Sequence, residues 1–156
     1  MRTHVALLRG INVGGHNKVA MADLRSVVSS LGHADVATYI QSGNVAFTSR
    51  HPDTTSIAGD MERAIAEALG VQPRVVVLAC DELALVVAGN PFPDEANSKC
   101  LHAVFTMEQL APCDIEGVAA AVERAGGKGS RDEARVVGRT LYLRTPDGLG
   151  RSVLAV

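Results

Sequence analysis

The clearest gap in the composition of this 156-residue chain is aromatic, because tryptophan is absent and aromatic residues make up only 3%. Hydrophobic residues still reach 47%, so the core must be built mainly from Val, Leu, Ile and Ala. A chain of this length suits one compact domain or two small modules. No apolar run approaches the roughly 20 residues that cross a membrane, and no secretory cleavage pattern follows the N-terminal stretch. These absences predict a soluble, cytoplasmic protein.

Paired cysteines and metal-binding motifs are also lacking. Cys80, Cys100 and Cys113 form neither a CxxC pair nor an even-numbered disulfide framework, which favours reduced thiols. None of the five histidines is spaced with another histidine or a cysteine in a recognised zinc pattern. We therefore expect no metal site and no cofactor.

Charge is unevenly distributed along the chain, although the formal net charge is only −2. Residues 1–50 hold five basic and two acidic side chains, residues 51–123 hold three and twelve, and residues 124–156 hold seven and three. If the two ends met in space, they would form a positive surface that attracts phosphates or carboxylates. Ordinary solvated helix faces and loops would explain the same distribution, so both interpretations stay open.

The first half of the chain predicts the element order β-α-β-β-α-β. Strand-like runs occur at 4–8, 36–40, 45–48 and 74–79, and apolar residues recur at helical spacing over 21–31 and 54–69. Asp53 or Thr54 can cap the start of the second helix, and Gly70 can end it. Gln41 to Asn44 supplies hairpin turn chemistry between two strands. The order over residues 1–80 matches the ferredoxin-like motif.

The second half, residues 81–156, repeats part of this order. A short helix at 82–88 and a proline-containing loop at 89–93 precede a β-α-β-β pattern at 101–106, 115–122, 134–137 and 140–144. Asp114 is the expected helix cap. A complete second repeat would need one more helix. We therefore expect an α+β protein of two ferredoxin-like modules with antiparallel sheets, the second truncated at its C-terminus.

The stretch from Arg9 to Lys18 lies between a strand and a helix, which is the usual context of a phosphate-binding loop. Its residues fit neither a Walker motif nor the Rossmann glycine spacing. Gly14 and Gly15 can nevertheless turn backbone N–H groups toward one anion, with Arg9 and Lys18 closing on it. A structural turn whose glycines only supply positive φ would explain the same residues.

The predicted hairpin offers a second group of polar side chains, Gln41, Ser42 and Asn44. A nucleophilic serine would need a base beside it, and no histidine is near in sequence. Turn chemistry alone would also explain the Ser-Gly-Asn sequence. We therefore favour hydrogen bonding to a ligand over nucleophilic catalysis.

Nucleic-acid binding is disfavoured. A ferredoxin-like sheet binds RNA when aromatic residues on its central strands stack bases. The predicted strands carry Tyr39, Phe47, Phe105 and Tyr142, but no clustered basic and aromatic signature accompanies them, and the net charge is acidic.

Two strings, LLRGINVGGHNKVAMADLR and TYIQSGNVAF, resemble the uncharacterised bacterial family called domain of unknown function 1697. The resemblance continues through 90–93, 101–105 and 141–152, and it implies two ferredoxin-like modules but no biochemical activity. Members of that family continue past GxGRSKL into a further helix, whereas here Val153 replaces the lysine and the sequence stops at Val156. The resemblance therefore implies an incomplete second module, whose apolar surface a partner chain could cover.

The leading hypothesis is a binding module for a small anionic or polar ligand, because binding residues concentrate on loops of a rigid scaffold. The expected ligand-binding residues are Arg9, Asn12, Gly14, Gly15, Lys18, Gln41, Ser42, Asn44 and Arg151. One alternative is an enzyme acting on such a ligand, with His4, His16 or Tyr39 as its titratable group. The other is an interaction protein that forms a homodimer through the second module.

Overall fold

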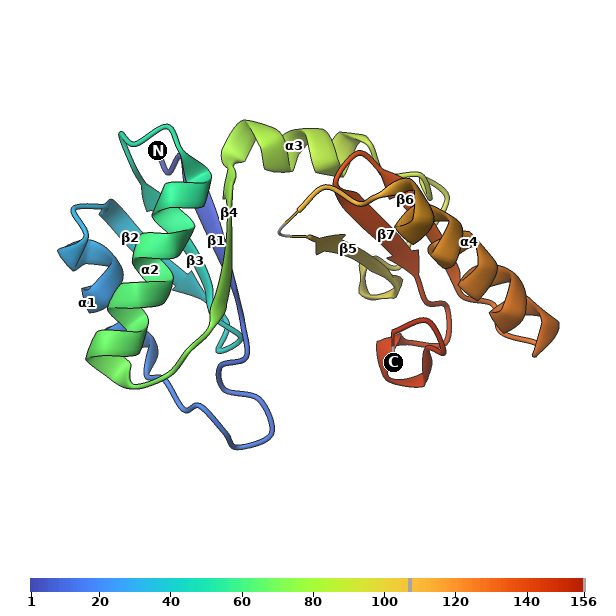
Figure 1. Ribbon diagram of the computed structural model, residues 1–156, viewed down its shortest axis with the longest axis horizontal. Coiled ribbons are helices and arrows are strands. Elements are labelled where there is room, and N and C mark those ends of the chain that lie inside the picture. Colours follow the sequence, from blue (N-terminus) through green and yellow to red (C-terminus); the bar gives the residue numbers. More distant parts are fainter. Residues whose placement is uncertain (107, 156) are drawn as a thin grey trace. The chain divides into compact units, whose positions relative to one another are not determined.

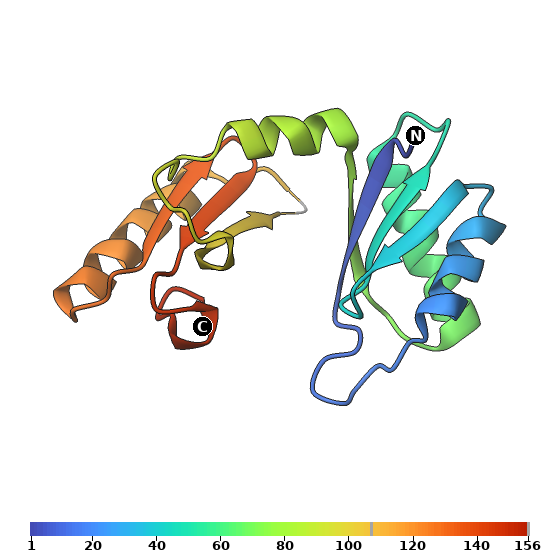
Figure 2. The same ribbon diagram turned by 180° about the vertical axis from the view of Figure 1, so that it is seen from behind.

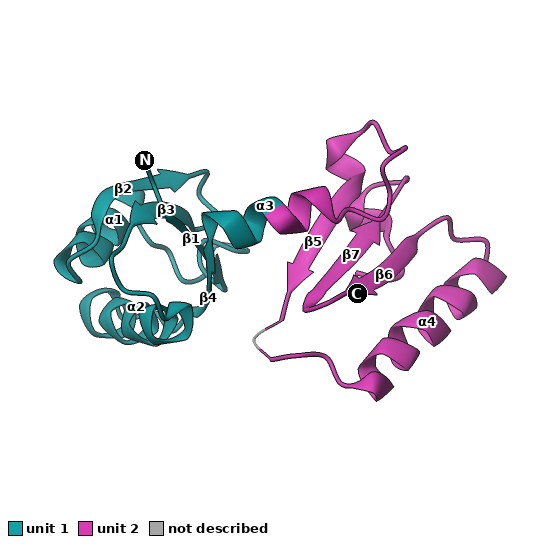
Figure 3. Cartoon of the chain, turned by 90° about the horizontal axis from the view of Figure 1, so that it is seen from above, with its two compact units in different colours: residues 1–84 teal, residues 85–156 magenta. Residues whose placement is uncertain are grey.

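The computed structural model describes residues 1–106 and 108–155 and shows an α+β protein with two antiparallel sheets. The chain divides into two compact units, Met1–Ala84 and Leu85–Val156 (Figure 3). The boundary falls within helix α3 (Cys80–Ala88), which begins two residues before the predicted helix. Within the described part of the chain, every helix is too short or too polar to cross a membrane.

Unit 1 contains four strands, β1 (His4–Arg9), β2 (Ala34–Tyr39), β3 (Asn44–Thr48) and β4 (Arg74–Ala79). They lie in the order β2-β3-β1-β4, and every neighbouring pair is antiparallel. All four predicted strands are present within two residues of their expected bounds. The hairpin turn occupies residues 40–43, so Asn44, expected in the turn, instead begins β3 and pairs with Tyr39.

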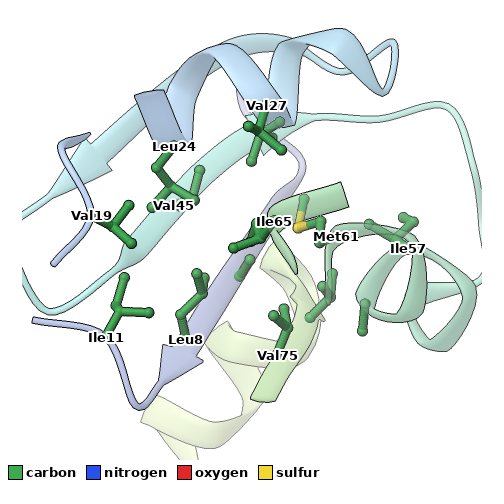
Figure 4. Packing of buried hydrophobic residues seen from close by; sticks show 14 of the residues in the cluster. Leu8, Ile11, Val19, Leu24, Val27, Val45, Ile57, Met61, Ile65 and Val75 are labelled. Atoms are coloured by element: carbon green, nitrogen blue, oxygen red, sulfur yellow. The ribbon is translucent and has the colours of Figure 1, made fainter. Parts of the chain in front are cut away.

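Helices α1 (Met21–Ser30) and α2 (Thr54–Leu69) cover the same face of this sheet (Figures 1 and 2). Their apolar stripes pack on alternate residues of the strands, as Figure 4 shows. Met61 and Ile65 of α2 and Val45 of β3 are fully buried. Burying each such side chain contributes about 1.5–3 kcal/mol. We call the other face of the sheet the open face.

The ends of α2 follow from two local signals. The Asp53 carboxylate accepts hydrogen bonds from the backbone N–H groups of Thr55 and Ser56 at 2.9 and 3.2 Å. Gly70 closes the helix with φ 68°, a left-handed conformation that glycine adopts without strain. Both predictions for this helix are confirmed.

Unit 2 contains β5 (Leu101–Phe105), α4 (Pro112–Gly127), β6 (Glu133–Val137) and β7 (Thr140–Arg144), with the strand order β5-β7-β6. The prediction that Asp114 caps α4 is wrong, because Ala111 is the cap. Pro112 favours the first helical position, where its missing N–H is not needed. Asp114 therefore lies inside the helix, and its carboxylate accepts the Ala111 N–H at 2.9 Å.

The two units share one strand arrangement. In unit 1 the chain forms β1, α1, β2 and β3, with the neighbour order β2-β3-β1. In unit 2 it forms β5, α4, β6 and β7, with the equivalent neighbour order β6-β7-β5. Unit 1 then adds α2 and β4, whereas unit 2 continues into a short 3₁₀ helix, η2 (Leu149–Arg151).

Candidate functional site

Polar side chains gather at one end of the open face of unit 1. Side chains alternate along a strand, so buried Leu8 faces the helices while exposed Arg9 faces the open side. The strand register places Tyr39, Asn44 and Leu7 side by side in the same row of the sheet. Tyr39 is 72% exposed. The row therefore presents a phenol and an amide next to the end of β1.

Arg9 lies directly opposite Arg74 of β4 in the antiparallel register. Like charges in this position repel each other. The Nε of Arg74 pairs with the Glu62 carboxylate at 3.4 Å, and the Arg74 side chain stays 68% exposed. Among the described residues, Arg9 has no ion-pair partner within 4.0 Å. The pair therefore presents two guanidinium groups with only one nearby carboxylate.

We call this end of unit 1 the loop-end surface. It comprises Arg9, Tyr39, Asn44, Arg74 and the loops 10–20 and 40–43. Sequence reasoning missed Arg74. The expected β-α-β-β-α-β order indicates that the first and last strands pair, but not the register that sets Arg74 opposite Arg9.

The side chain of Asn12 holds the two loops together. Its amide nitrogen donates to the carbonyl oxygens of Val19 at 2.9 Å and Gln41 at 3.0 Å. Its amide oxygen accepts the Val19 N–H at 2.8 Å. Asn12 adopts φ 52°, a left-handed conformation that asparagine tolerates better than most residues. The Asn12 amide is therefore engaged by the backbone, and it positions the loops.

An apolar contact supports the same arrangement. Gly43 has φ 90°, and a Cβ atom built there would lie 2.6 Å from Cδ1 of Ile11 and 3.0 Å from Cβ of Leu8. Ile11 is only 1% exposed. Next to this contact, Ile40 adopts φ 52°, which is strained for a β-branched residue. The hairpin thus packs closely on the first loop because residue 43 has no side chain.

The remaining predicted ligand contacts of unit 1 are exposed. Gly14 and Gly15 have φ 59° and 80°, and they lie at the exposed tip of the first loop. Lys18, Gln41 and Ser42 are also exposed. The loop-end surface is consequently an open surface of donors and cations.

Arg151 belongs to the other unit, where it ends η2. It is exposed. The pKa of Asp147 is lowered mainly by the hydrogen bond from Arg131, and the charge of Arg151 lowers it further. The remaining predicted contact residues all belong to unit 1.

The titratable groups proposed for an enzyme are divided between the two ends of β1. His4 lies at the end opposite Arg9, is 8% exposed, and stacks on Phe47 with ring centroids 5.5 Å apart. His16 and Tyr39 lie in or beside the loops of the loop-end surface. In the described residues, no three His, Cys, Asp or Glu side chains gather in a way that could hold a metal ion.

A cavity of about 210 Å³ lies between the end of α1 and the start of α2. It is lined by Leu31, Gly32, His33, Ser49, Arg50, His51, Ile57 and Asp60. Burial lowers the pKa of His33, the positive charges of His4 and His51 lower it further, and Asp60 opposes them.

Unit 2 contains a larger cavity, of about 430 Å³, with mainly apolar walls. It is lined by His102, Val104, Val118, Ala121, Ala134, Leu141, Leu143, Leu149, Leu154 and Ala155. The ring Nε2 of His102 lies 3.2 Å from Oγ1 of Thr145, within hydrogen-bond distance. The walls of this cavity come from the sheet, from α4 and from the segment that follows β7.

Comparisons with known proteins agree with the motifs in the sequence. No functionally curated protein matches the chain. Among solved structures, the conserved bacterial protein SP0830 from Streptococcus pneumoniae is similar, with a TM-score of 0.68 and 25% identity. The alignment covers 93% of this chain and 77% of that chain. A family described as "Protein of unknown function (DUF1697)" matches residues 1–142. The predicted resemblance is confirmed, and the chain belongs to the DUF1697 family.

Proposed function

We propose that this protein is a binding module for a small anionic or polar ligand, which it holds at the loop-end surface. The observation that carries the proposal is the cross-strand pair of Arg9 and Arg74. The register sets these two like-charged side chains on neighbouring strands, where they repel each other, and an anion that contacts both would relieve that repulsion. Arginine forms two parallel hydrogen bonds with phosphate or carboxylate groups, which gives both affinity and orientation.

The loops supply the other contacts that such a ligand needs. Lys18 adds a positive charge, and backbone N–H groups at Gly14 and Gly15 can act as donors at an exposed loop tip. Gln41, Ser42 and Asn44 can orient a polar ligand by hydrogen bonds. The hydrogen bond from Asn12 to the Gln41 carbonyl supports a common site, because it holds the two loops in one arrangement.

The proposal is tested by native mass spectrometry of the gently purified protein, followed by binding measurements on any retained molecule. We expect the Arg9→Ala, Lys18→Ala double variant to bind at least about tenfold more weakly, since charge-assisted hydrogen bonds are lost. The Arg124→Ala, Arg139→Ala variant is the matched control, because it removes the same charge from exposed sites of unit 2. Equal affinity of the wild type and the first variant would reject the proposal.

We also propose that both units are ferredoxin-like modules, with β5, α4, β6 and β7 as the first four elements of the motif in unit 2. The β-α-β-β-α-β order and the sheet order β2-β3-β1-β4 in unit 1 support this. The neighbour order β6-β7-β5 in unit 2 is equivalent to β2-β3-β1 in unit 1, which supports the same motif in unit 2. Backbone NMR contacts between Leu7 and Val76, and between His102 and Leu143, would test the β1–β4 and β5–β7 pairings.

The cavity of unit 2 favours a second candidate function, a protein that dimerises through this unit. In unit 1, the paired residues Ala6 and Val45 are fully buried under helices. The equivalent pair in unit 2 is Val104 and Leu141, and Val104 is 42% exposed in the apolar cavity. Exposed apolar patches of this kind serve as interaction sites.

Sedimentation velocity at high protein concentration tests this second candidate. Val104→Asp should convert a dimer to a monomer, because it places a charge in the contact. Val137→Asp is the control, since Val137 is 48% exposed but points to the other face of the same sheet. A wild-type protein that stays monomeric would reject the dimer.

A further inference from the structure

The loop-end surface combines two features that a simple anion would not need together. One is the Arg9–Arg74 pair at the edge of the sheet, and the other is an exposed aromatic ring, Tyr39, on the face to which Arg9 also points. We propose that the ligand is a nucleoside monophosphate, whose phosphate lies on the two arginines and whose base stacks on Tyr39. This inference rests on the proposed function and names the class of its ligand.

The arginine pair suits a phosphate that carries more than one negative charge. A phosphate monoester has a charge of about −1.5 to −2 at pH 7 and three acceptor oxygens. Arg9 has no ion-pair partner among the described residues, and the contact of Arg74 with Glu62 uses Nε. The Glu62 oxygen also accepts the Val75 N–H at 2.8 Å, which ties it to the backbone. We expect a bound phosphate to engage the terminal nitrogens of both arginines.

Tyr39 differs from the other aromatic residues in its exposure. Phe47, Phe92 and Tyr142 are 0%, 7% and 6% exposed and Phe105 is half-buried, whereas Tyr39 is 72% exposed. Its neighbour Thr38 accepts a hydrogen bond from Arg25 of α1 at 2.8 Å, so alternation directs Tyr39 to the open face. An exposed ring is a platform on which a base can stack.

The distance across the sheet suits a base and a phosphate joined by a ribose. Tyr39 is on β2 and Arg9 is on β1, with β3 between them, so the strands are about 10 Å apart. Asn44 lies between Tyr39 and Leu7 in one row, and Arg9 follows two residues after Leu7 on the same face of β1. Its amide can donate to and accept from the sugar or the base. Stacking, hydrogen bonding and charge are thus arranged in that order across the open face.

The tip of the hairpin supports the same interpretation. Ile40 is held at φ 52° and is 59% exposed beside Tyr39. Backbone strain of this kind clusters at binding sites. A stacked base would cover Tyr39 and give the exposed apolar group a partner.

The test measures affinities by titration calorimetry at pH 7.5 with three probes: adenosine 5′-monophosphate, ribose 5-phosphate and adenosine. The monophosphate should bind about tenfold more tightly than either fragment, since stacking and charge both contribute. Tyr39→Ala should weaken adenosine, and should weaken the monophosphate to the level of ribose 5-phosphate, whereas Tyr39→Phe should retain both affinities. Arg74→Ala should weaken both phosphates, with Arg139→Ala as the charge-matched control. Arg74 and Arg139 are both exposed, and thermal melting checks that the variants fold.

The outcomes separate this inference from the proposed function. If the two phosphates bind equally and Tyr39→Ala changes neither, the base-stacking inference is wrong while anion binding stands. If a carboxylate or a different phosphate binds at Arg9 but the monophosphate does not, the monophosphate inference is wrong while the proposed function stands. If no anion shifts the backbone NMR signals of residues 9–18 and 41–44, both fail.

Discussion

The side-chain amide of Asn12 donates a hydrogen bond to the backbone carbonyl of Gln41 at 3.0 Å, across 29 positions of the sequence. The same amide exchanges hydrogen bonds with the backbone of Val19. One side chain therefore fixes the path of the first loop and its distance from the hairpin. The proposed ligand contacts on the two loops depend on this arrangement.

Replacing Asn12 tests the connection directly. Asn12→Ala removes the three hydrogen bonds and places alanine at φ 52°, so we expect a loss of about 1–3 kcal/mol in the free energy of unfolding. Asn12→Asp keeps an acceptor for the Val19 N–H and should lose less. Urea denaturation measures both. The connection would be unimportant if Asn12→Ala were as stable as the wild type.

Gly43→Ala tests the close packing of the hairpin. The new Cβ would meet Ile11 at 2.6 Å, in addition to the strain at φ 90°, so we expect a loss of about 2–4 kcal/mol. Gly15→Ala is the control, because φ is 80° there and no atom lies within 4 Å of the Cβ position. Its loss should be about 1–2 kcal/mol from backbone strain alone. Equal losses in thermal or urea unfolding would show that packing at Gly43 adds nothing.

Asp53→Ala tests the cap of α2. The Thr55 and Ser56 N–H groups would lose their acceptor, so the free energy of unfolding should fall by about 0.5–2 kcal/mol. Thr55→Ala, at an exposed position of the same turn, should change stability by less. Chemical denaturation compares the two variants. A larger effect of Thr55→Ala would contradict the capping role of Asp53.

His33 makes the stability of unit 1 depend on pH. Its pKa is lowered in the folded protein, mainly by burial and then by His4 and His51. The unfolded chain therefore binds the proton more readily, and stability falls as the pH drops through the ordinary pKa of histidine toward the lowered value. His33→Gln should show a weaker decline over this range. NMR titration of the His33 ring checks the direction, and a pKa at or above the ordinary histidine value would contradict it.

Much of the fold was predictable because its signals are local. The bounds of α2, the cap at Asp53 and the end at Gly70 follow from neighbouring residues, and β4 follows from one apolar run. The start of α4 was missed because Pro112 and Asp114 compete for the same end, and proline prefers the first helical position.

The sequence by itself determined the α+β class, the order of the elements and the polar character of the loops, since these depend on periodicity and turn residues. Only the tertiary structure decided that Arg74 lies beside Arg9 and that Asn12 reaches Gln41. Both relationships join residues far apart in the sequence. Strand register and loop packing bring them together, and neither is encoded in the spacing of adjacent residues.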